Sequence, residues 1–457
     1  MQSKKEKVLR LIEELYPISA FTPPPDGVLT IDGQKKFLQD FRVAERYREY
    51  RDCGFTEIIF SGETKYCGEP FEDSQLKRML DLAQEADLRA IVFDERIMQL
   101  TVKTKRRIVG ELFSTKKEFY AYVAQCLADY ADHPAFYGIS IVDEPMIAAA
   151  GVLKDICAAV HAAQPHAFVH TCFLPFIQDR GRIEGAFGKG YRDGWAAYRN
   201  YIRTMSQSGI GYFGYDAYPF GMWESKNDMC AGYVRNMQEA AQTAQKCGVP
   251  FHMTIQSFSS GKNDELRRVD EADLNWQSNL ALAFGCCKIY YFTYWRFTTR
   301  QADFFTSAIM DDDGTKLLYD EAQRNNALIR RTARFVGNLQ YVCTKIIHAP
   351  HENKAMQGIK ETSLPEIYAV HAQAPLLINK LARESTAYCL LNLRDPYEKE
   401  LNALRFRVRW SKEETIGIVK NGERMLLQSE NGWYRLVLSP GEAVWILRGE
   451  KTTGEDQ

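Results

Sequence analysis

Between residues 16 and 294, short apolar segments alternate with amphipathic helical segments. The apolar segments show little polar alternation, which is typical of strands covered on both faces in a parallel sheet. Parallel strands need crossover connections, so the intervening helices should pack outside the sheet. The predicted strands are residues 17–21, 56–60, 89–93, 136–142, 167–173, 210–215, 250–255 and 288–294, and the predicted helices are residues 34–51, 74–86, 116–130, 152–163, 195–206, 232–246 and 270–284.

Eight strand–helix units fit the (β/α)8 TIM barrel, whose typical length is about 250 residues. A doubly wound open sheet is the alternative, but no GxGxxG turn follows the first predicted strand. The sequence therefore predicts an α/β fold of the TIM-barrel type.

The pattern changes after a predicted closing helix at residues 315–342. Seven short β-like segments follow, separated by turn residues and without helices, which is typical of a small β-sandwich. We therefore predict a catalytic barrel at residues 1–345, a C-terminal β-sandwich at 346–450 and a frayed tail at 451–457. The predicted strands of the small domain are residues 367–371, 387–392, 404–408, 415–419, 425–428, 433–438 and 443–447.

Charge and cysteine content constrain the partners and the compartment. The chain has 58 basic and 59 acidic side chains, so no overall field attracts nucleic acid or anionic lipid. No apolar run is long enough to cross a bilayer, and the amino terminus lacks a signal-peptide core. The 11 scattered cysteines form no CxxC pair and favour reduced thiols. We expect a cytoplasmic protein without membrane or nucleic-acid partners, and homo-oligomerisation is compatible with the sequence.

The most informative local segment spans residues 135–145 and ends in Asp143-Glu144-Pro145. Pro145 cannot donate to a strand ladder, so pairing should stop there and leave two carboxylates at the carboxyl end of a buried strand. Barrel enzymes place their chemistry at this end. Glu144 is therefore a candidate catalytic acid, and the alternative is a strand-ending charge pair that faces solvent.

Other predicted strands also end in polar or aromatic residues, which would converge on one rim of a barrel. Carboxylates together with tyrosine and tryptophan suit a sugar, because sugar rings stack on aromatic faces and hydroxyls bond polar groups. A carbohydrate substrate is therefore expected. The candidates are Glu63 after the second strand, Asp94 and Glu95 after the third, Asp143 at the fourth, Tyr215, Asp216 and Tyr218 at the sixth, Gln256 at the seventh, and Tyr294, Trp295 and Arg296 at the eighth.

Glycosidic cleavage needs one carboxylic acid that protonates the leaving oxygen and a second group that attacks or stabilises the anomeric carbon. Glu144 suits the first role, because burial near Asp143 or a sugar would raise its pKa towards neutrality. The role of Asp143 stays open. Adjacent strand residues face opposite ways, so Asp143 can bond either the barrel wall or a substrate hydroxyl.

These segments resemble clan A glycoside hydrolases, especially family 42-like bacterial barrels. In those families the fourth strand ends in Asn-Glu-Pro or a near variant whose Glu is the acid/base, and the matching residues here are Asp143-Glu144-Pro145. The resemblance implies a (β/α)8 barrel with a small C-terminal β domain, and no cofactor. Further similar segments are residues 133–138, 215–220, 265–267, 279–285, 290–295 and 439–444.

One departure concerns the second catalytic group. The nucleophile of the clan is a Glu at the end of strand seven, where this chain has Gln256. Asp216 can replace it, as can Glu63, Asp94 or Glu95. A further alternative resembles the substrate-assisted hexosaminidases of family 20, with Asp143 orienting the substrate and Glu144 as the acid.

Two other classes remain beside hydrolysis. Gln256 is compatible with a sugar-binding barrel that has lost catalysis. A metal-dependent isomerase or lyase would use Asp94, Glu95, Asp143 and Asp216, but the histidine ligands expected at strand ends are missing. Asp311-Asp312-Asp313-Gly314 resembles a fragment of a calcium loop without its distal Glu, so we predict a turn there and no metal.

Overall fold

The computed structural model describes residues 16–22, 24, 28–31, 34–37, 42–60, 65–104, 107–176, 180–221, 232–260, 266–296, 305–347, 356, 358–409 and 415–448. By its contacts the chain divides into two compact units. The first comprises Met1–Ala217, Thr243–Asn263 and Lys288–Gln323, and the second comprises Tyr218–Gln242, Asp264–Cys287 and Arg324–Gln457. The predicted C-terminal tail lies outside the described residues.

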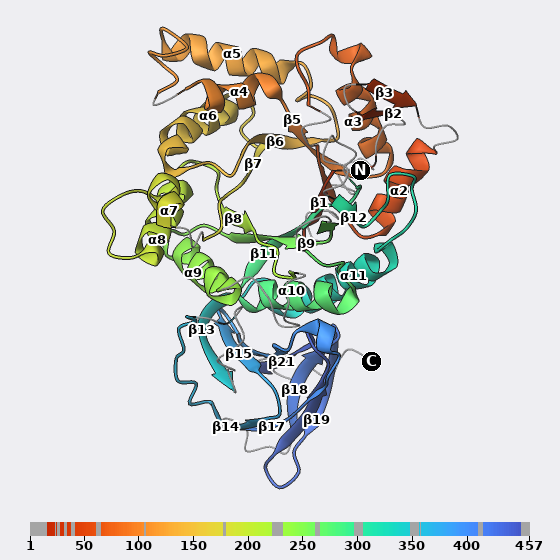
Figure 1. Ribbon diagram of the computed structural model, residues 1–457, viewed down its shortest axis with the longest axis vertical. Helices are drawn as coiled ribbons and strands as arrows, with labels where there is room; N and C mark the ends of the chain where they lie inside the picture. Colours follow the sequence, from red (N-terminus) through yellow and green to blue (C-terminus); the bar gives the residue numbers. More distant parts are fainter. Residues whose placement is uncertain are drawn as a thin grey trace, which may run out of the picture. The chain divides into compact units, whose positions relative to one another are not determined.

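Eight parallel strands form one sheet whose spatial order follows the chain. The last strand pairs with the first, as Ile18 opposite Ile289 shows, and a single bridge between Phe173 and Tyr215 joins the remaining two edges. This arrangement confirms the predicted TIM-barrel type of sheet. In Figure 1 strands β5 to β9 stand at the centre of the first unit. The strands are β1 (Ile18–Phe21), β4 (Glu57–Ile59), β5 (Arg89–Phe93), β6 (Phe136–Asp143), β7 (Phe168–Cys172), β8 (Phe213–Asp216), β9 (Phe251–Gln256) and β11 (Cys286–Phe292).

Several of the helices between these strands begin at side-chain caps. Ser74 accepts a hydrogen bond from the Lys77 N–H, and a capping box of Thr115 and Glu118 starts the helix before β6. Figure 1 shows α4 to α8 around the strands of the first unit. The helices are α2 (Val43–Asp52), α3 (Gln75–Glu85), α4 (Glu95–Lys103), α5 (Lys116–Ala128), α6 (Ala150–Ala163), α7 (Arg180–Phe187), α8 (Gly194–Ser206), α9 (Tyr233–Lys246), α10 (Glu271–Ala283) and α11 (Tyr319–Val336).

Two predicted helices differ from the structure. The predicted helix at residues 34–51 is wrong at its start, because β3 (Gln34–Phe37) pairs with β2 (Val28–Ile31) and α2 begins only at Val43. The predicted helix at residues 315–342 is shorter, because residues from Gln340 onward join a strand.

The C-terminal region forms two antiparallel sheets, with strand orders β13-β15-β16-β21-β18-β19 and β14-β17-β20. Ile378 and Ile446 from the larger sheet share a buried cluster with Phe406 and Leu438 from the smaller one. The predicted domain boundary at residue 345 falls inside β13. Figure 1 draws these strands in teal and blue. They are β13 (Gln340–Ile347), β14 (Ile367–Ala372), β15 (Leu376–Ala382), β16 (Thr386–Asn392), β17 (Asn402–Val408), β18 (Thr415–Lys420), β19 (Glu423–Gln428), β20 (Tyr434–Leu438) and β21 (Ala443–Arg448).

A buried ion network links the first strand of the barrel to the last. The Ser19 hydroxyl on β1 donates to Glu57 Oε2 on β4 at 2.8 Å, and Glu57 also pairs with Arg89 on β5 and Lys288 on β11. Burial would raise the pKa of Glu57, but the two cations outweigh it and lower that pKa. Four adjacent strands are therefore held through one carboxylate.

None of the helices in the described ranges combines the length and the apolar character that a bilayer span requires.

Candidate active site

Glu144 lies one residue beyond β6 in a left-handed backbone conformation with φ 45°. This region is uncommon for a residue with a side chain and costs about 1–3 kcal/mol, so the surroundings must hold it. The Glu144 N–H donates to the Cys172 carbonyl at 2.8 Å. The Tyr201 hydroxyl donates to the Pro145 carbonyl at 2.7 Å and accepts from the Leu174 N–H at 3.1 Å. These bonds anchor the backbone on both sides of the Glu144 side chain.

The ends of β6, β7 and β8 place further polar groups beside Glu144. Asp143 is opposite Cys172 in the ladder between β6 and β7. The Cys172 thiol donates to Asp216 Oδ1 at 3.5 Å, which connects the end of β7 to the end of β8. Three carboxylates, Asp143, Glu144 and Asp216, therefore gather at the carboxyl ends of neighbouring strands.

Their charges interact strongly enough to shift two pKa values. Partial desolvation, followed by the negative charges of Asp216 and Asp143, raises the pKa of Glu144 to about 7. Partial desolvation and then the charge of Asp216 raise the pKa of Asp143 to about 6, against a backbone hydrogen bond from Glu144. Both side chains remain accessible to solvent. The site thus combines accessible carboxyl groups with protonation near neutral pH.

The left-handed turn also resolves the expected orientation of Asp143. Regular alternation would send Asp143 and Glu144 to opposite sides of the strand. Because φ of Glu144 is positive, the pleat is broken at this point. The charge of Asp143 acts on Glu144, the Glu144 backbone donates a hydrogen bond to Asp143, and the charge of Asp216 acts on both side chains. The pair therefore belongs to one electrostatic cluster.

Cys172 is a site residue that the sequence prediction missed. Burial and then the charges of Asp216 and Asp143 raise the pKa of its thiol well above the usual range. The thiol therefore stays protonated and keeps its hydrogen bond to Asp216. Its position at the end of the predicted strand 167–173 was the signal that could have identified it.

The carboxylates after β5 are engaged in structural contacts. Asp94 is buried and caps α4, and its oxygens accept from Arg96 Nη2 at 2.8 Å and from the Tyr130 hydroxyl at 3.0 Å. Glu95 pairs with Lys65 at 2.9 Å, and this contact holds the Glu95 pKa at about 2. These contacts do not involve Asp143, Glu144 or Asp216, and the candidate Glu63 lies outside the described residues.

Most of the predicted aromatic candidates lie inside the packing. Tyr215 and Tyr294 have exposed fractions of 0% and Trp295 of 2%, so a ligand cannot reach them in this conformation. Gln256 is also buried, and its Nε2 donates to the Phe258 carbonyl at 3.1 Å. Tyr218 is half-buried.

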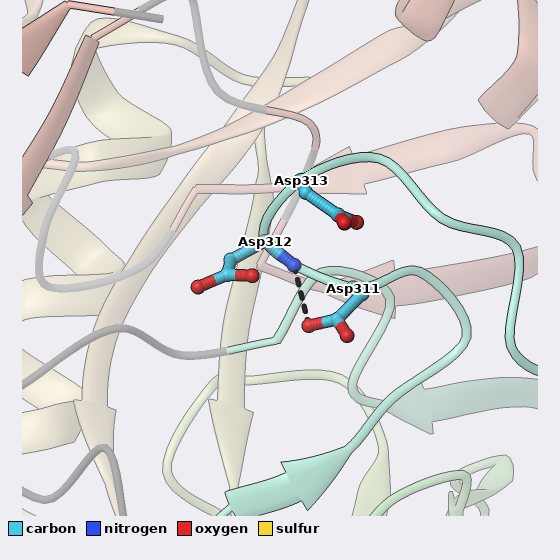
Figure 2. Close-up of side chains that lie close together, drawn as sticks. All are labelled: Asp311, Asp312 and Asp313. Atoms are coloured by element: carbon cyan, nitrogen blue, oxygen red, sulfur yellow. Dashed lines mark hydrogen bonds between the residues drawn. The ribbon is translucent and has the colours of Figure 1, made fainter.

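Arg296 contacts the acidic run at residues 311–313. It pairs with Asp311 and, at 2.9 Å, with Asp312. Figure 2 shows the Asp312 N–H donating to Asp311. The Asp311 N–H donates to the Thr315 carbonyl at 2.8 Å. Within the described ranges, Asp311, Asp312 and Asp313 form the one group of three or more His, Cys, Asp or Glu side chains that lie close enough together to share a metal ion. The arginine partner and the backbone bonds fit the predicted turn.

Comparisons with known proteins concern the fold. No protein-family model and no curated protein matches the chain. A family 39 glycoside hydrolase from the gut symbiont Bacteroides cellulosilyticus WH2 matches with a TM-score of 0.50 and 10% identity, over 95% of this chain and 81% of that chain. A β-galactosidase from the psychrophilic Marinomonas ef1 matches with a TM-score of 0.49 and 11% identity, over 70% of this chain and 60% of that chain. At such identity, the first match shows a shared fold.

Proposed function

We propose that this protein is a glycoside hydrolase that acts on short oligosaccharides or glycosides, with Glu144 as general acid/base and Asp216 as the second catalytic carboxylate. The observation that carries the proposal is the cluster of Asp143, Glu144 and Asp216 at the strand ends, with the Glu144 pKa raised to about 7. Within the glycoside hydrolases, the Asp143-Glu144-Pro145 segment supports a clan A, family 42-like assignment. No cofactor is needed for this chemistry.

The reaction follows from the two protonation states. Protonated Glu144 donates to the glycosidic oxygen as the bond to the anomeric carbon breaks. Ionised Asp216 either attacks that carbon or takes a proton from the water that does. Glu144, now ionised, can accept a proton in a second step if a glycosyl-enzyme forms. Carboxyl groups about 5–5.5 Å apart act by the retaining route, and those about 6.5–9.5 Å apart by the inverting route.

Asp143 is proposed as a substrate-binding residue and as a means of tuning Glu144. Its charge contributes to the raised Glu144 pKa. In the substrate-assisted alternative, Asp143 would instead orient a nucleophilic group of the substrate. The buried Gln256, whose amide donates to a backbone carbonyl, does not offer a carboxylate in either scheme.

The decisive experiment is Glu144→Gln, assayed on a panel of aryl glycosides and natural disaccharides. We expect turnover on substrates with poor leaving groups to fall about 10²–10⁴-fold, because no acid then protonates the leaving oxygen. Substrates with activated leaving groups should lose much less. The matched control is Glu95→Gln, which removes a carboxylate at a neighbouring strand end and should leave turnover nearly unchanged. Equal activity of Glu144→Gln and wild type on disaccharides would refute the acid assignment.

Asp216→Asn separates the two mechanisms. If Asp216 is the second carboxylate, the variant should be about as inactive as Glu144→Gln, and azide should restore turnover as a glycosyl azide. If activity survives in Asp216→Asn but is lost in Asp143→Asn, on substrates with an N-acetyl group, the substrate-assisted alternative is correct.

A further inference from the structure

The outer face of the three-stranded sheet β14-β17-β20 is strongly basic. Along β17, Leu404, Phe406 and Val408 are buried in the core of the second unit. Side chains alternate along a strand, so the residues between and after them point away from this core. These residues are Arg405, Arg407 and Arg409. At about 3.4 Å per residue, the three arginines recur roughly every 7 Å along the strand.

Aromatic side chains hold these guanidinium groups in place. Arg407 Cζ lies 4.3 Å and Arg405 Cζ 5.0 Å from the ring centroid of Trp433, just before β20. Arg409 Cζ lies 5.3 Å from the ring centroid of Tyr368 on β14. Stacking engages the flat face of a guanidinium and leaves its N–H edges available as donors.

Strand register concentrates positive charge on the same face. Arg405 is directly opposite Arg435 on β20 and opposite His371 on β14. Like charges in directly opposite positions destabilise a sheet. Arg435 pairs with Glu430 at 3.2 Å, but Arg405, Arg407 and Arg409 have no carboxylate partner among the residues that the structure places. An anion bound across the strands would relieve this repulsion.

We propose that this arginine face, formed by Arg405, Arg407, Arg409, Arg435, His371 and Trp433, binds an anionic glycan through the carboxylates of its sugars. Arginine forks bind carboxylates with two parallel hydrogen bonds. The choice of a glycan rests on the proposed hydrolase function. A single-stranded nucleic acid fits less well, because its bases need open aromatic faces. Guanidinium groups already engage the rings of Trp433 and Tyr368, which leaves less open aromatic surface for bases.

The test is affinity electrophoresis of the whole protein in native gels that contain polygalacturonate or, at equal concentration, fully methyl-esterified polygalacturonate. The backbone is the same in both, and only the charge differs. We expect retardation by the acidic polymer alone, weakening as salt rises. Arg405→Gln should weaken binding roughly fivefold or more, since one charged fork is lost. Arg405→Lys, which keeps the charge but not the fork, should bind with intermediate strength.

Arg424→Gln is the matched control, because Arg424 is an exposed arginine on β19 of the other sheet. Equal weakening by Arg424→Gln, equal retardation in both gels, or no retardation at all would overturn the proposal. Tighter binding of an oligothymidylate with the same dependence on Arg405 would also overturn it, in favour of nucleic acid. Circular dichroism checks that each variant folds, and Arg409→Gln gives a second, independent substitution.

The two proposals fail separately. Arg405→Gln should leave the hydrolysis of small aryl glycosides unchanged, because Arg405 is outside the proposed catalytic cluster. A protein without glycosidase activity that is still retained by polygalacturonate through Arg405 would refute the hydrolase and support the binding face. A protein that hydrolyses glycosides but is not retained by polygalacturonate would refute only the proposed binding face.

Discussion

Glu144 and Asp143 titrate near neutrality because each is partly desolvated and faces Asp216. An isolated carboxyl group titrates near pH 4, so at neutral pH it would be almost fully ionised and could not serve as an acid. The raised pKa lets Glu144 carry a proton at the pH where Asp216 is needed as an anion. The chemistry of the site therefore depends on the mutual placement of three ordinary side chains.

The pH dependence of kcat/KM should reflect this coupling. We expect the basic limb of the profile to lie near pH 7, since activity falls as Glu144 loses its proton. Asp143→Asn removes a neighbouring negative charge, so the Glu144 pKa should fall and the basic limb should move to lower pH. A pH–rate profile of both proteins on one substrate measures the shift. If the basic limb lies at the same pH in Asp143→Asn and wild type, a group other than Glu144 determines it.

The same pKa makes Glu144 a destabilising residue at high pH. Its folded pKa of about 7 exceeds the unfolded value of about 4.3, so the folded state binds the proton more tightly and stability declines as pH rises between them. Glu144→Gln should therefore have a higher Tm than wild type at pH 8 and a much smaller advantage at pH 5. Thermal unfolding at both pH values measures the difference.

The opposite change of stability with pH is expected at Glu95, because Lys65 holds its pKa at about 2. Ionised Glu95 stabilises the folded state above the pKa that Glu95 has in the unfolded chain, and this stabilisation disappears as the pH falls towards 2. Glu95→Gln should then lower the Tm at pH 8. A higher Tm for both variants at pH 8 would contradict this account of the two environments.

At the residue scale, sequence reasoning succeeded where position along a strand was sufficient. The abrupt end at Pro145 predicted the location of Asp143 and Glu144, and the direction of the Glu144 pKa shift followed from burial beside another carboxylate. It did not succeed for Tyr294 and Trp295. Their exposure depends on whether each side chain points into the core or towards solvent. The sequence of a short apolar segment does not reveal this direction. Their roles as ligand contacts remain unsupported.

At the element scale, the position of β6 depends on its close approach to β7. A Cβ built on Gly138 of β6 would lie 1.9 Å from the Phe168 carbonyl oxygen, far inside van der Waals contact. Gly138 and Phe168 are opposite each other in the ladder. Strand β6, which leads to the candidate acid, can therefore pair in this register only because its third residue has no side chain.

Gly138→Ala should destabilise the protein by about 3 kcal/mol, because the strands must separate to admit the methyl group. The matched control is Gly417→Ala on β18, where an added Cβ meets nothing within 4 Å. That substitution should be close to neutral. Chemical denaturation of the two variants measures the contrast, and a similar free energy of unfolding for both would show that β6 can shift to accommodate a side chain.

Helix starts were predictable because capping residues mark them, as Ser74 and Thr115 do. The hairpin of β2 and β3 was missed because the polar run that begins at Gln34 was joined to the helix that follows. The strand β13 was missed for a similar reason, since it follows α11 closely. In both cases pairing with another strand decided a segment that is ambiguous in isolation.

At the scale of the whole molecule, the alternation of strands and helices in the sequence predicted the barrel type. It did not predict the ion network inside the barrel. Glu57, Lys288 and Arg89 are far apart in the sequence, and the first two are almost fully buried. Their meeting depends on closure of the sheet between β1 and β11. Only a folded barrel brings these strand starts together.

Glu57→Gln should destabilise the protein by about 3–5 kcal/mol, because it leaves Lys288 buried without its counter-charge. Lys288→Met should be less damaging, since Arg89 still pairs with Glu57. The control is Glu271→Gln, which breaks an exposed pair with Arg324 and should cost less than about 1 kcal/mol. Urea unfolding compares the three. A loss below about 1 kcal/mol for Glu57→Gln would show that water or a neighbour compensates the lysine.

The left-handed backbone at position 144 also limits what evolution or an engineer can place there. In a saturation library, glycine, asparagine and aspartate should yield well-folded protein even when they abolish turnover. Valine and isoleucine, whose branched Cβ clashes in that conformation, should be lost from the soluble fraction. The soluble abundance of the position-144 variants and their turnover would then rank the amino acids in different orders.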